Sequence, residues 1–277
     1  DSWEPHVVVD PFGVLHVVWR EQDPDISEAK IYYRMRTSSG EWSDIEVLSG
    51  EGALQPRIAV DPSGTVHVIY AEHQVYYTFK SAGGGWSSPQ EIAPYGLNLA
   101  MSAGNDGTVH VVYEAGEEIF YVTGSPTGDW SEPVNVSQSS WYSWVPSVAV
   151  SSGGKVWVNW VEVGQRAMYY SFKEPDGEWS PADSVPDIPG YPGSNQIAYS
   201  NSSDLHYIWQ EIRVGAPDIY SKAVDPEGIW YCETNVSNTA GESLAPSFAF
   251  GPEGLYVVWS EKNDGNWEIY LDTLSSR

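Results

Sequence analysis

Six glutamates stand at one position of a pattern that returns along the chain, and such a set of carboxylates could carry chemistry. Two carboxylates roughly 5–9.5 Å apart, one with a raised pKa, suffice to cleave a neutral glycan. Crowded carboxylates would also favour a hard cation, for which calcium is the best match. Because every repeat keeps the glutamate, we favour the alternative that each one accepts local hydrogen bonds. The six are Glu21, Glu72, Glu114, Glu162, Glu211 and Glu261.

Two connections break the repeat with aromatic residues. One carries Trp141, Tyr142 and Trp144, and a second, rich in proline, carries Tyr191. Trp and Tyr join a flat apolar ring to a polar group. A sugar can stack its C–H groups on such a ring while neighbouring carboxylates and amides bind its hydroxyls. The sequence therefore predicts that these aromatic residues are anchors for a glycan.

The candidate binding residues are not equivalent. Trp144 aligns with Trp3 and with leucines of other repeats, so a packing role is favoured for it. Trp141 and Tyr142 have no counterpart, and binding and loop packing are equally good interpretations for them. The surface around Arg57 and Glu72 is the second candidate region.

Four histidines occupy another recurrent position, in the second strand expected for each repeat. That strand is not innermost, so the imidazoles would lie too far apart to share one metal ion at about 2 Å. A hydrogen bond from each histidine to the turn of its own repeat is the favoured interpretation. The four are His16, His67, His110 and His206.

These residues must be positioned by a repeated sheet. The His67 position recurs at 16, 110, 157, 206 and 256, at intervals of 43 to 51 residues. Each repeat contains short runs rich in Val, Ile, Tyr and Trp, bounded by Gly, Pro, Asp and Ser, which is typical of strands and turns. Four strands at such a period are typical of a propeller blade. We therefore predict an all-β, six-bladed β-propeller with four-stranded antiparallel blades.

One domain is expected, because the repeat has no linker or low-complexity break. The expected blades are approximately residues 1–50, 51–94, 95–140, 141–189, 190–240 and 241–277. The last repeat lacks the Trp-Ser turn and the run after it, so the last blade should have three strands. Its strand from Trp267 to Thr273 would be an open edge, unless Asp272 and the tail protect it or the native chain continues.

Composition excludes several function classes. The formal net charge is −25, with only 13 Lys and Arg, so the chain would repel nucleic acid and anionic bilayers. No apolar run approaches the roughly 20 residues of a membrane span. Cys232 is the only cysteine, which excludes an intrachain disulfide, and we expect it to be buried in a strand. Acidity and few lysines and cysteines favour an extracellular or cell-surface protein, of prokaryotic origin.

Three Asn-x-Ser triplets match the pattern for N-glycosylation. Serine-rich turns produce such triplets by chance, and we give them little weight. They begin at Asn135, Asn201 and Asn235.

The Gly-x-Trp-Ser turns at 128–131 and 176–180 resemble the Asp-box turns of sialidase-related propellers, also called bacterial neuraminidase repeats. The family's full Ser-x-Asp-x-Gly-x-Thr-Trp is not present. Residues 31–34, Ile-Tyr-Tyr-Arg, are similar to six-bladed fucose-binding lectins, whose pockets lie between blades. The sialidase resemblance implies three arginines, a Tyr–Glu pair and an Asp acid/base. Arg57 has a plausible position, but the triad cannot be assembled from the remaining candidates, Arg34, Arg36, Arg166 and Arg213.

The sequence therefore predicts a non-catalytic extracellular propeller that binds a glycan or a protein partner on the face carrying the interblade loops. One alternative is a glycoside hydrolase or lyase of sialidase-like fold that acts on a neutral polysaccharide with a Glu/Asp pair. Another is a structural repeat unit of a larger cell-surface protein. No cofactor is expected, with calcium at the six glutamates as the one candidate. We expect a monomer unless the open edge strand pairs.

Overall fold

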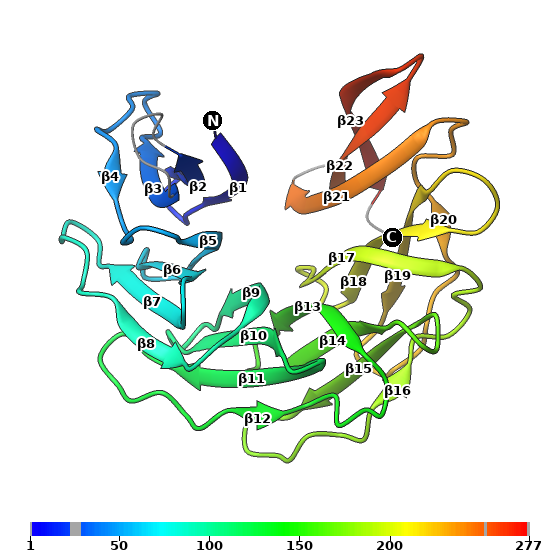
Figure 1. Cartoon of the computed structure of the whole chain (residues 1–277), viewed down its shortest axis with the longest axis horizontal. Coiled ribbons are helices and arrows are strands. Elements are labelled where there is room, and N and C mark those ends of the chain that lie inside the picture. Colours follow the sequence, from blue (N-terminus) through cyan, green and yellow to red (C-terminus); the bar gives the residue numbers. More distant parts are fainter. Residues whose placement is uncertain (1, 23–28, 252–253, 276–277) are drawn as a thin grey trace. The chain divides into compact units, whose positions relative to one another are not determined.

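The computed structural model describes residues 2–22, 29–251 and 254–275. These residues form 23 β-strands and contain no helix. Five sheets have four antiparallel strands and one has three, and within each sheet consecutive strands are neighbours (Figure 1). Over the described residues, this confirms the predicted six-bladed β-propeller with a three-stranded last blade.

The chain forms two compact units, Asp1–Gln138 with Ser152–Gly154, and Ser139–Ser151 with Lys155–Arg277. The first unit holds blades 1 to 3. Their strands are β1 (Ser2–Val9), β2 (Leu15–Gln22), β3 (Ala29–Arg36), β4 (Glu46–Val47), β5 (Leu54–Val60), β6 (Val66–Ala71), β7 (Val75–Lys80), β8 (Gln90–Ala93), β9 (Leu97–Ala103), β10 (Val109–Ala115), β11 (Glu118–Gly124) and β12 (Val134–Asn135).

The second unit holds blades 4 to 6. Their strands are β13 (Ser143–Val150), β14 (Val156–Glu162), β15 (Ala167–Lys173), β16 (Asp183–Ser184), β17 (Tyr191–Tyr199), β18 (Leu205–Ile212), β19 (Asp218–Val224), β20 (Thr234–Asn235), β21 (Glu242–Gly251), β22 (Gly254–Asn263) and β23 (Asn266–Ser275).

The register places two kinds of loop at the same end of each blade. In blade 5, Glu211 pairs with Pro192 near the start of the first strand and with Asp218 at the start of the third. The hairpin after the second strand therefore lies beside the connection that enters the blade. This arrangement confirms the loop face expected from the sequence, and in blades 4 and 5 it positions the candidate site.

Cores form between consecutive blades because each sheet is apolar on both faces. In the first unit, Tyr70 of blade 2 packs with Ile31 and Tyr33 of blade 1. In the second unit, Trp209 of blade 5 packs with Met168 of blade 4. A buried aromatic residue removes about 150–250 Å² from water, so these contacts hold neighbouring blades together.

In blades 2 and 3 the tryptophan of the Trp-Ser turn reaches the preceding blade. The rings of Trp86 and Tyr33 meet edge to face with centroids 4.8 Å apart, and those of Trp130 and Tyr77 at 4.9 Å. Aromatic pairs favour such edge-to-face geometry. The turn that resembles an Asp box therefore joins one blade to the next.

The recurrent histidines bond within their own blades. His16 Nδ1 lies 2.7 Å from Tyr33 Oη, and its Nε2 lies 3.4 Å from Asp10 Oδ2 in the preceding turn. His67 repeats both contacts, with Asp61 at 3.5 Å. Burial lowers the pKa of both imidazoles, which keeps them neutral inside the sheet. The predicted hydrogen bond to the turn is confirmed for His16.

First strands of the first unit are linked through bulges. Glu4, Gln55 and Asn98 have φ angles of 52°, 53° and 48°, which turn their N–H groups out of the ladder. The Gln55 N–H donates to Glu4 Oε2 at 2.8 Å, and the Asn98 N–H donates to Gln55 Oε1 at 2.6 Å. The bulges at Gln55 and Asn98 are therefore each fixed by a side chain from the blade before.

The expectation for Cys232 is wrong, because this residue is exposed. It lies between the Trp230 bridge and β20, in a segment without strand structure. Among the described residues, no helix is long and apolar enough to cross a membrane.

Candidate functional site

The recurrent glutamate of blade 4 anchors the loop that carries Trp141. Glu162 is buried, and its Oε1 accepts hydrogen bonds from Trp160 Nε1 at 2.7 Å and Ser143 Oγ at 2.9 Å. Its Oε2 accepts from Ser139 Oγ at 3.0 Å. Ser139 Oγ in turn accepts the backbone N–H of Trp141 at 2.9 Å. A buried carboxylate therefore holds the entry of this interblade loop through one serine.

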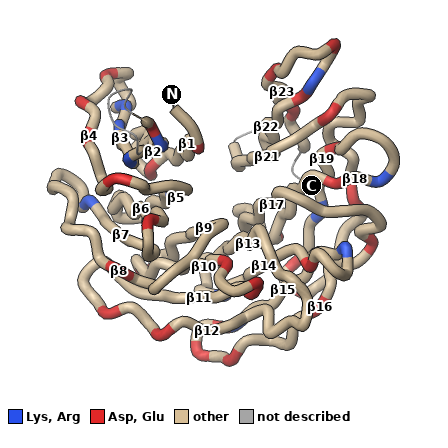
Figure 2. The backbone as a smooth tube through the Cα atoms, in the orientation of Figure 1, with Lys and Arg blue, Asp and Glu red and all other residues tan. Residues whose placement is uncertain are grey.

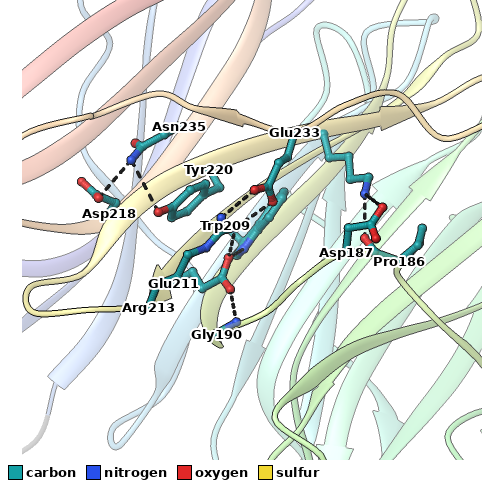
Figure 3. Close-up of polar contacts among 11 residues, drawn as sticks. Pro186, Asp187, Gly190, Trp209, Glu211, Arg213, Asp218, Tyr220, Glu233 and Asn235 are labelled. Atoms are coloured by element: carbon teal, nitrogen blue, oxygen red, sulfur yellow. Dashed lines mark hydrogen bonds and ion pairs between the residues drawn. The ribbon is translucent and has the colours of Figure 1, made fainter.

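Glu211 has the same function in blade 5, where it is 0% exposed. It accepts hydrogen bonds from the backbone N–H of Gly190, next to Tyr191, and from Trp209 Nε1 at 3.0 Å (Figure 3). Arg213 Nη2 donates to it at 2.7 Å. The loop that carries Tyr191 is therefore also held by the recurrent glutamate.

Arg213 extends this network to the outer strand of blade 5. Its guanidinium forms two hydrogen bonds to Glu233, at 2.6 and 2.7 Å, and lies 3.7 Å from the centroid of the Tyr220 ring (Figure 3). The bonds to Glu233, with those to Glu211, raise the pKa of Arg213, so it stays charged. The cation neutralises two carboxylates and fixes the hairpin after β18.

Three of the predicted anchors are exposed on the loops held in this way. Trp141 is 50% exposed, Tyr142 38% and Tyr191 45%. Trp141 lies flat against the hairpin after β14, where a Cβ added to Gly164 would be 2.0 Å from Trp141 Cε3. Tyr142 accepts the Val163 N–H through its backbone carbonyl at 2.9 Å. Both residues are thus packed on one hairpin while their rings face solvent.

The same hairpin also contacts Tyr191. Arg166 Cζ lies 4.2 Å from the centroid of the Tyr191 ring, a cation–π contact. The hairpin at residues 163–166 therefore contacts both the loop of Trp141 and Tyr191, the first residue of β17. We call Trp141, Tyr142, Arg166 and Tyr191 the aromatic platform, and all four belong to the second unit.

The aromatic platform is exposed at all four of its residues. It offers aromatic rings, a guanidinium and loop backbone groups, which can stack on and hydrogen-bond to a polar ligand. The two carboxylates that hold its loops, Glu162 and Glu211, are buried and accept hydrogen bonds at both oxygens.

The other predicted site residues lie elsewhere. Trp144 is half-buried within β13, opposite Val161. Arg57 lies in the first unit on β5, where it donates to the Pro56 carbonyl at 2.9 Å. Glu72 accepts the Gly50 N–H at 3.1 Å, so in blade 2 too the recurrent glutamate holds an interblade connection. The structure does not bring Arg57 and Glu72 together through a direct contact of their side chains.

The metal hypothesis gains no support from the geometry. Over the residues that the structure describes, no group of three or more His, Cys, Asp and Glu side chains could hold a metal ion. The recurrent glutamates face donors instead. Glu21 accepts from Trp19 Nε1 at 2.6 Å, Glu114 from Asn98 Nδ2 at 2.5 Å and Glu261 from Trp259 Nε1 at 2.9 Å.

A cavity of about 420 Å³ lies on blade 1 and is lined by three tryptophans, among other residues. One of them, Trp19, occupies a repeat position whose other members are buried between blades. Tyr70 and Trp209, for example, are packed against the preceding blade. The Trp19 position that lines this cavity thus corresponds to a position that packs against a neighbouring blade elsewhere in the chain. We therefore assign no ligand to the cavity. The lining is Ser2, Trp3, Pro5, Val17, Trp19, Glu21, Arg34 and Trp42.

Sequence reasoning missed Arg166, Gly164 and Arg213 as parts of the site. Arg166 and Tyr191 are separated by the strands β15 and β16, and nothing in their spacing predicts the contact. The one available signal is scarcity, because cations are few and Asp and Glu are spread over all six blades (Figure 2). That signal is weak, because cations lie over aromatic rings elsewhere too, for example Arg34 over Trp42 and Lys173 over Trp179.

Solved structures of similar fold are numerous. A sialidase from the Hadza microbiome, Hz136, has a TM-score of 0.68 and 15% identity, over 99% of this chain and 66% of the sialidase. This chain thus spans just under two thirds of that protein. A protein of unknown function from Dyadobacter fermentans has a TM-score of 0.69 and 12% identity, over 100% and 95% of the two chains. An α-L-arabinofuranosidase from Fusarium graminearum has a TM-score of 0.64 and 12% identity, over 99% and 93%.

The sequence matches no protein-family model, and no curated protein sequence matches it. At these identities, structural similarity defines the fold alone. The chain has the fold of a sialidase-related six-bladed propeller, as the Gly-x-Trp-Ser turns indicated.

Proposed function

We propose that this protein binds a neutral glycan at the aromatic platform of blades 4 and 5, without cleaving it, outside the cell or at its surface. The observation that carries the proposal is the pair of exposed aromatic loops held against one hairpin. Rigid exposed aromatic residues bind well because little conformational entropy is lost when a ligand stacks on them. The propeller neighbours include proteins named as carbohydrate-active enzymes, which agrees with a glycan ligand.

Charge favours a neutral glycan over an acidic one. The formal net charge of −25 repels anions, and Arg166 is the only cation among the four platform residues. A sialic acid or uronic acid would need several cations to hold its carboxylate. In the second unit, Arg213 is already bonded to two glutamates, Glu211 and Glu233, so it is not free for that role.

The proposal is tested by a glycan array together with a screen for turnover on neutral polysaccharides. Saturable binding without release of reducing ends supports it. Turnover would instead show a hydrolase, and an unsaturated product would show a lyase. If neither binding nor turnover is detected, a structural unit of a larger surface protein would be the better explanation.

Trp141→Ala should weaken glycan binding by on the order of 1–2 kcal/mol, about five- to thirtyfold, because a stacking surface is lost. The melting temperature should change little, since half of the side chain is exposed. Isothermal titration calorimetry on the best array ligand measures the first effect and calorimetric melting the second.

Trp42→Ala is the matched control, because Trp42 is also about half exposed but lies in the Trp-Ser turn of blade 1. It should leave glycan affinity unchanged. Equal losses in both variants, or a lower melting temperature with unaltered binding in Trp141→Ala, would contradict the platform as the binding site.

A further inference from the structure

Arg166 is an exposed cation whose hydrogen-bond donors the chain leaves unused. Over the described residues, no side chain or backbone group accepts a hydrogen bond from its guanidinium, and no carboxylate forms an ion pair with it. An arginine carries five N–H donors and no acceptor. These donors are therefore available to a ligand that binds at the aromatic platform.

Arg213, in the hairpin after β18, shows what satisfies a similar group in the same unit. Its guanidinium also lies over a tyrosine ring, with Cζ 3.7 Å from the centroid. Its donors, however, are bonded to Glu211 and Glu233 (Figure 3). Arg166 has the corresponding contact with Tyr191 at 4.2 Å, but no carboxylate. The protein itself supplies the acceptors of Arg213, whereas a ligand can supply those of Arg166.

The backbone of Arg166 lies in the left-handed region, with a φ of 55°. In the hairpin after β18, the residue with a positive φ is Gly215, at 83°. A residue with a Cβ is disfavoured in this region, and glycine is not. Backbone strain of this kind is concentrated at functional sites. The conformation therefore favours a role for the Arg166 side chain beyond closing the turn.

The hairpin also brings Arg166 close to the Trp141 ring. Trp141 packs against Gly164, two residues before Arg166, and all three belong to the second unit. Two residues of chain span at most about 7 Å. A sugar stacked on Trp141, or the next sugar of the same glycan, therefore lies within reach of the arginine side chain.

The shape of the guanidinium defines the acceptors that it fits. The group is planar and presents its donors as a rigid fork, which holds two acceptor atoms side by side. Stacking on Tyr191 restricts its orientation, so less conformational entropy is lost on binding. In a neutral sugar, two adjacent hydroxyl groups offer such a pair of oxygens. A carboxylate fits the same fork, but the formal net charge of −25 repels anions.

We propose that Arg166 determines the specificity of the aromatic platform by donating two hydrogen bonds to adjacent free hydroxyl groups of a neutral glycan. This inference rests on the proposed glycan binding and narrows the ligand to sugars with an unsubstituted vicinal diol at or next to the ring on Trp141. Tyr191 is then a positioning residue, which holds the plane of the guanidinium.

The test uses the full chain, the best neutral ligand of the glycan array and its monodeoxy derivatives, each of which lacks one hydroxyl group. Isothermal titration calorimetry should show that two derivatives, altered at adjacent ring positions, bind about tenfold more weakly. The reason is that each loses a hydrogen bond to a charged donor. The derivative altered at a primary hydroxyl is the control on the ligand and should bind as the parent does.

On the protein, Arg166→Ala should weaken binding of the parent glycan about tenfold and should bind the two sensitive derivatives as well as the parent. Such coupling between a change in the protein and a change in the ligand identifies a direct interaction. Arg166→Lys should not restore affinity, because lysine has no planar fork. Gln165→Ala is the matched control, since Gln165 is exposed in the same hairpin, and it should bind normally. Melting curves verify that all three variants fold.

The outcomes separate this inference from the proposed function. Absence of any glycan ligand would overturn both. A glycan that binds Arg166→Ala with full affinity, or that loses the same factor as its deoxy derivatives in this variant, would overturn the role of Arg166 alone. Rescue by Arg166→Lys, or tighter and salt-sensitive binding of a uronic acid analogue, would show a site for an anion and would overturn the vicinal diol as the ligand group.

Discussion

Glu211 is fully buried in a chain with a large excess of acidic residues, so its ionised form has to be compensated locally. A buried carboxylate is costly unless it is paired and hydrogen-bonded. Gly190, Trp209 and Arg213 supply donors to it. Each repeat keeps this glutamate because its side chain links the end of the second strand to the loop that enters the same blade.

Glu211→Ala should therefore destabilise the protein by about 3–5 kcal/mol, because buried donors lose their acceptor and Arg213 loses a buried partner. The melting temperature should fall by roughly 10 °C. Glu233→Ala is the control, since Glu233 is more exposed and its pair with Arg213 is worth about 1 kcal/mol or less. Similar losses of stability in the two variants would show that the burial of Glu211 does not cause the destabilisation.

His6 gives a pH dependence with a defined sign. Burial, with Arg57 nearby, lowers the pKa of His6 from 6.5 to about 4. The unfolded chain therefore binds the proton more readily between these values, and stability falls as pH drops from about 6.5 to 4. His6→Gln should remove part of this fall, reducing the loss of melting temperature by several degrees.

The measurement is a series of melting curves from pH 7.5 to 4. His73→Gln serves as the control because His73 is exposed, and its curve should follow that of the unchanged protein. A His6→Gln curve with an unaltered slope would mean that His6 is as easily protonated in the folded chain as in the unfolded one.

The hairpin at residues 163–166 is the element on which the platform depends. Gly164 leaves room for the Trp141 ring, and a Cβ there would lie 2.0 Å from Trp141 Cε3. Gly164→Ala should therefore displace the ring, and glycan affinity should fall about as much as in Trp141→Ala. Displacement of the Trp141 ring can be followed by near-ultraviolet circular dichroism.

Gly215→Ala is not a suitable control, because Gly215 has a positive φ of 83° and the substitution would strain the backbone. Gly85→Ala is better, since no atom lies within 4 Å of the added Cβ. Retained affinity in Gly164→Ala would show that the position of Trp141 does not limit binding.

The elements themselves were largely predictable. The spacing of His67 and its counterparts predicted six blades, and strand order within a blade follows from short antiparallel connections. The bulges at Gln55 and Asn98 could not be predicted, because each is fixed by a neighbouring blade distant in sequence. The fourth-strand role of Asn235 to Ser237 was missed for a related reason, since it depends on pairing with Asp218 and Ile219.

The candidate site was predictable where it breaks the repeat. Trp141, Tyr142 and Tyr191 lie in the two connections that break the repeat, and all three are exposed. The structure adds that Tyr142 and Tyr191 are equivalent, since each lies opposite the residue that follows the recurrent glutamate. Arg166 was not predictable, because its contact with Tyr191 joins a hairpin to the first residue of β17, two strands further along the chain. Local sequence patterns predict which residues are exposed but not which loops meet.

Charge acts on the whole molecule. With 38 Asp and Glu against 13 Lys and Arg, self-repulsion opposes compaction of the folded chain. Ionic strength screens exposed charges, with a Debye length of about 30 Å at 0.01 M and about 8 Å at 0.15 M. Raising sodium chloride across this range should therefore increase the melting temperature by a few degrees.

A comparison of calcium with magnesium distinguishes charge screening from specific binding of a metal ion. Each of the six recurrent glutamates accepts at least one hydrogen bond, and in the described residues no acidic group is arranged to hold a metal ion. Calcium chloride should therefore raise the melting temperature no more than magnesium chloride of equal concentration, and a chelator should have no effect in sodium chloride. A ligand that binds only the native state must raise stability as its concentration exceeds Kd. A saturable rise at micromolar calcium would contradict this expectation and would show that the carboxylates exchange their donors for an ion.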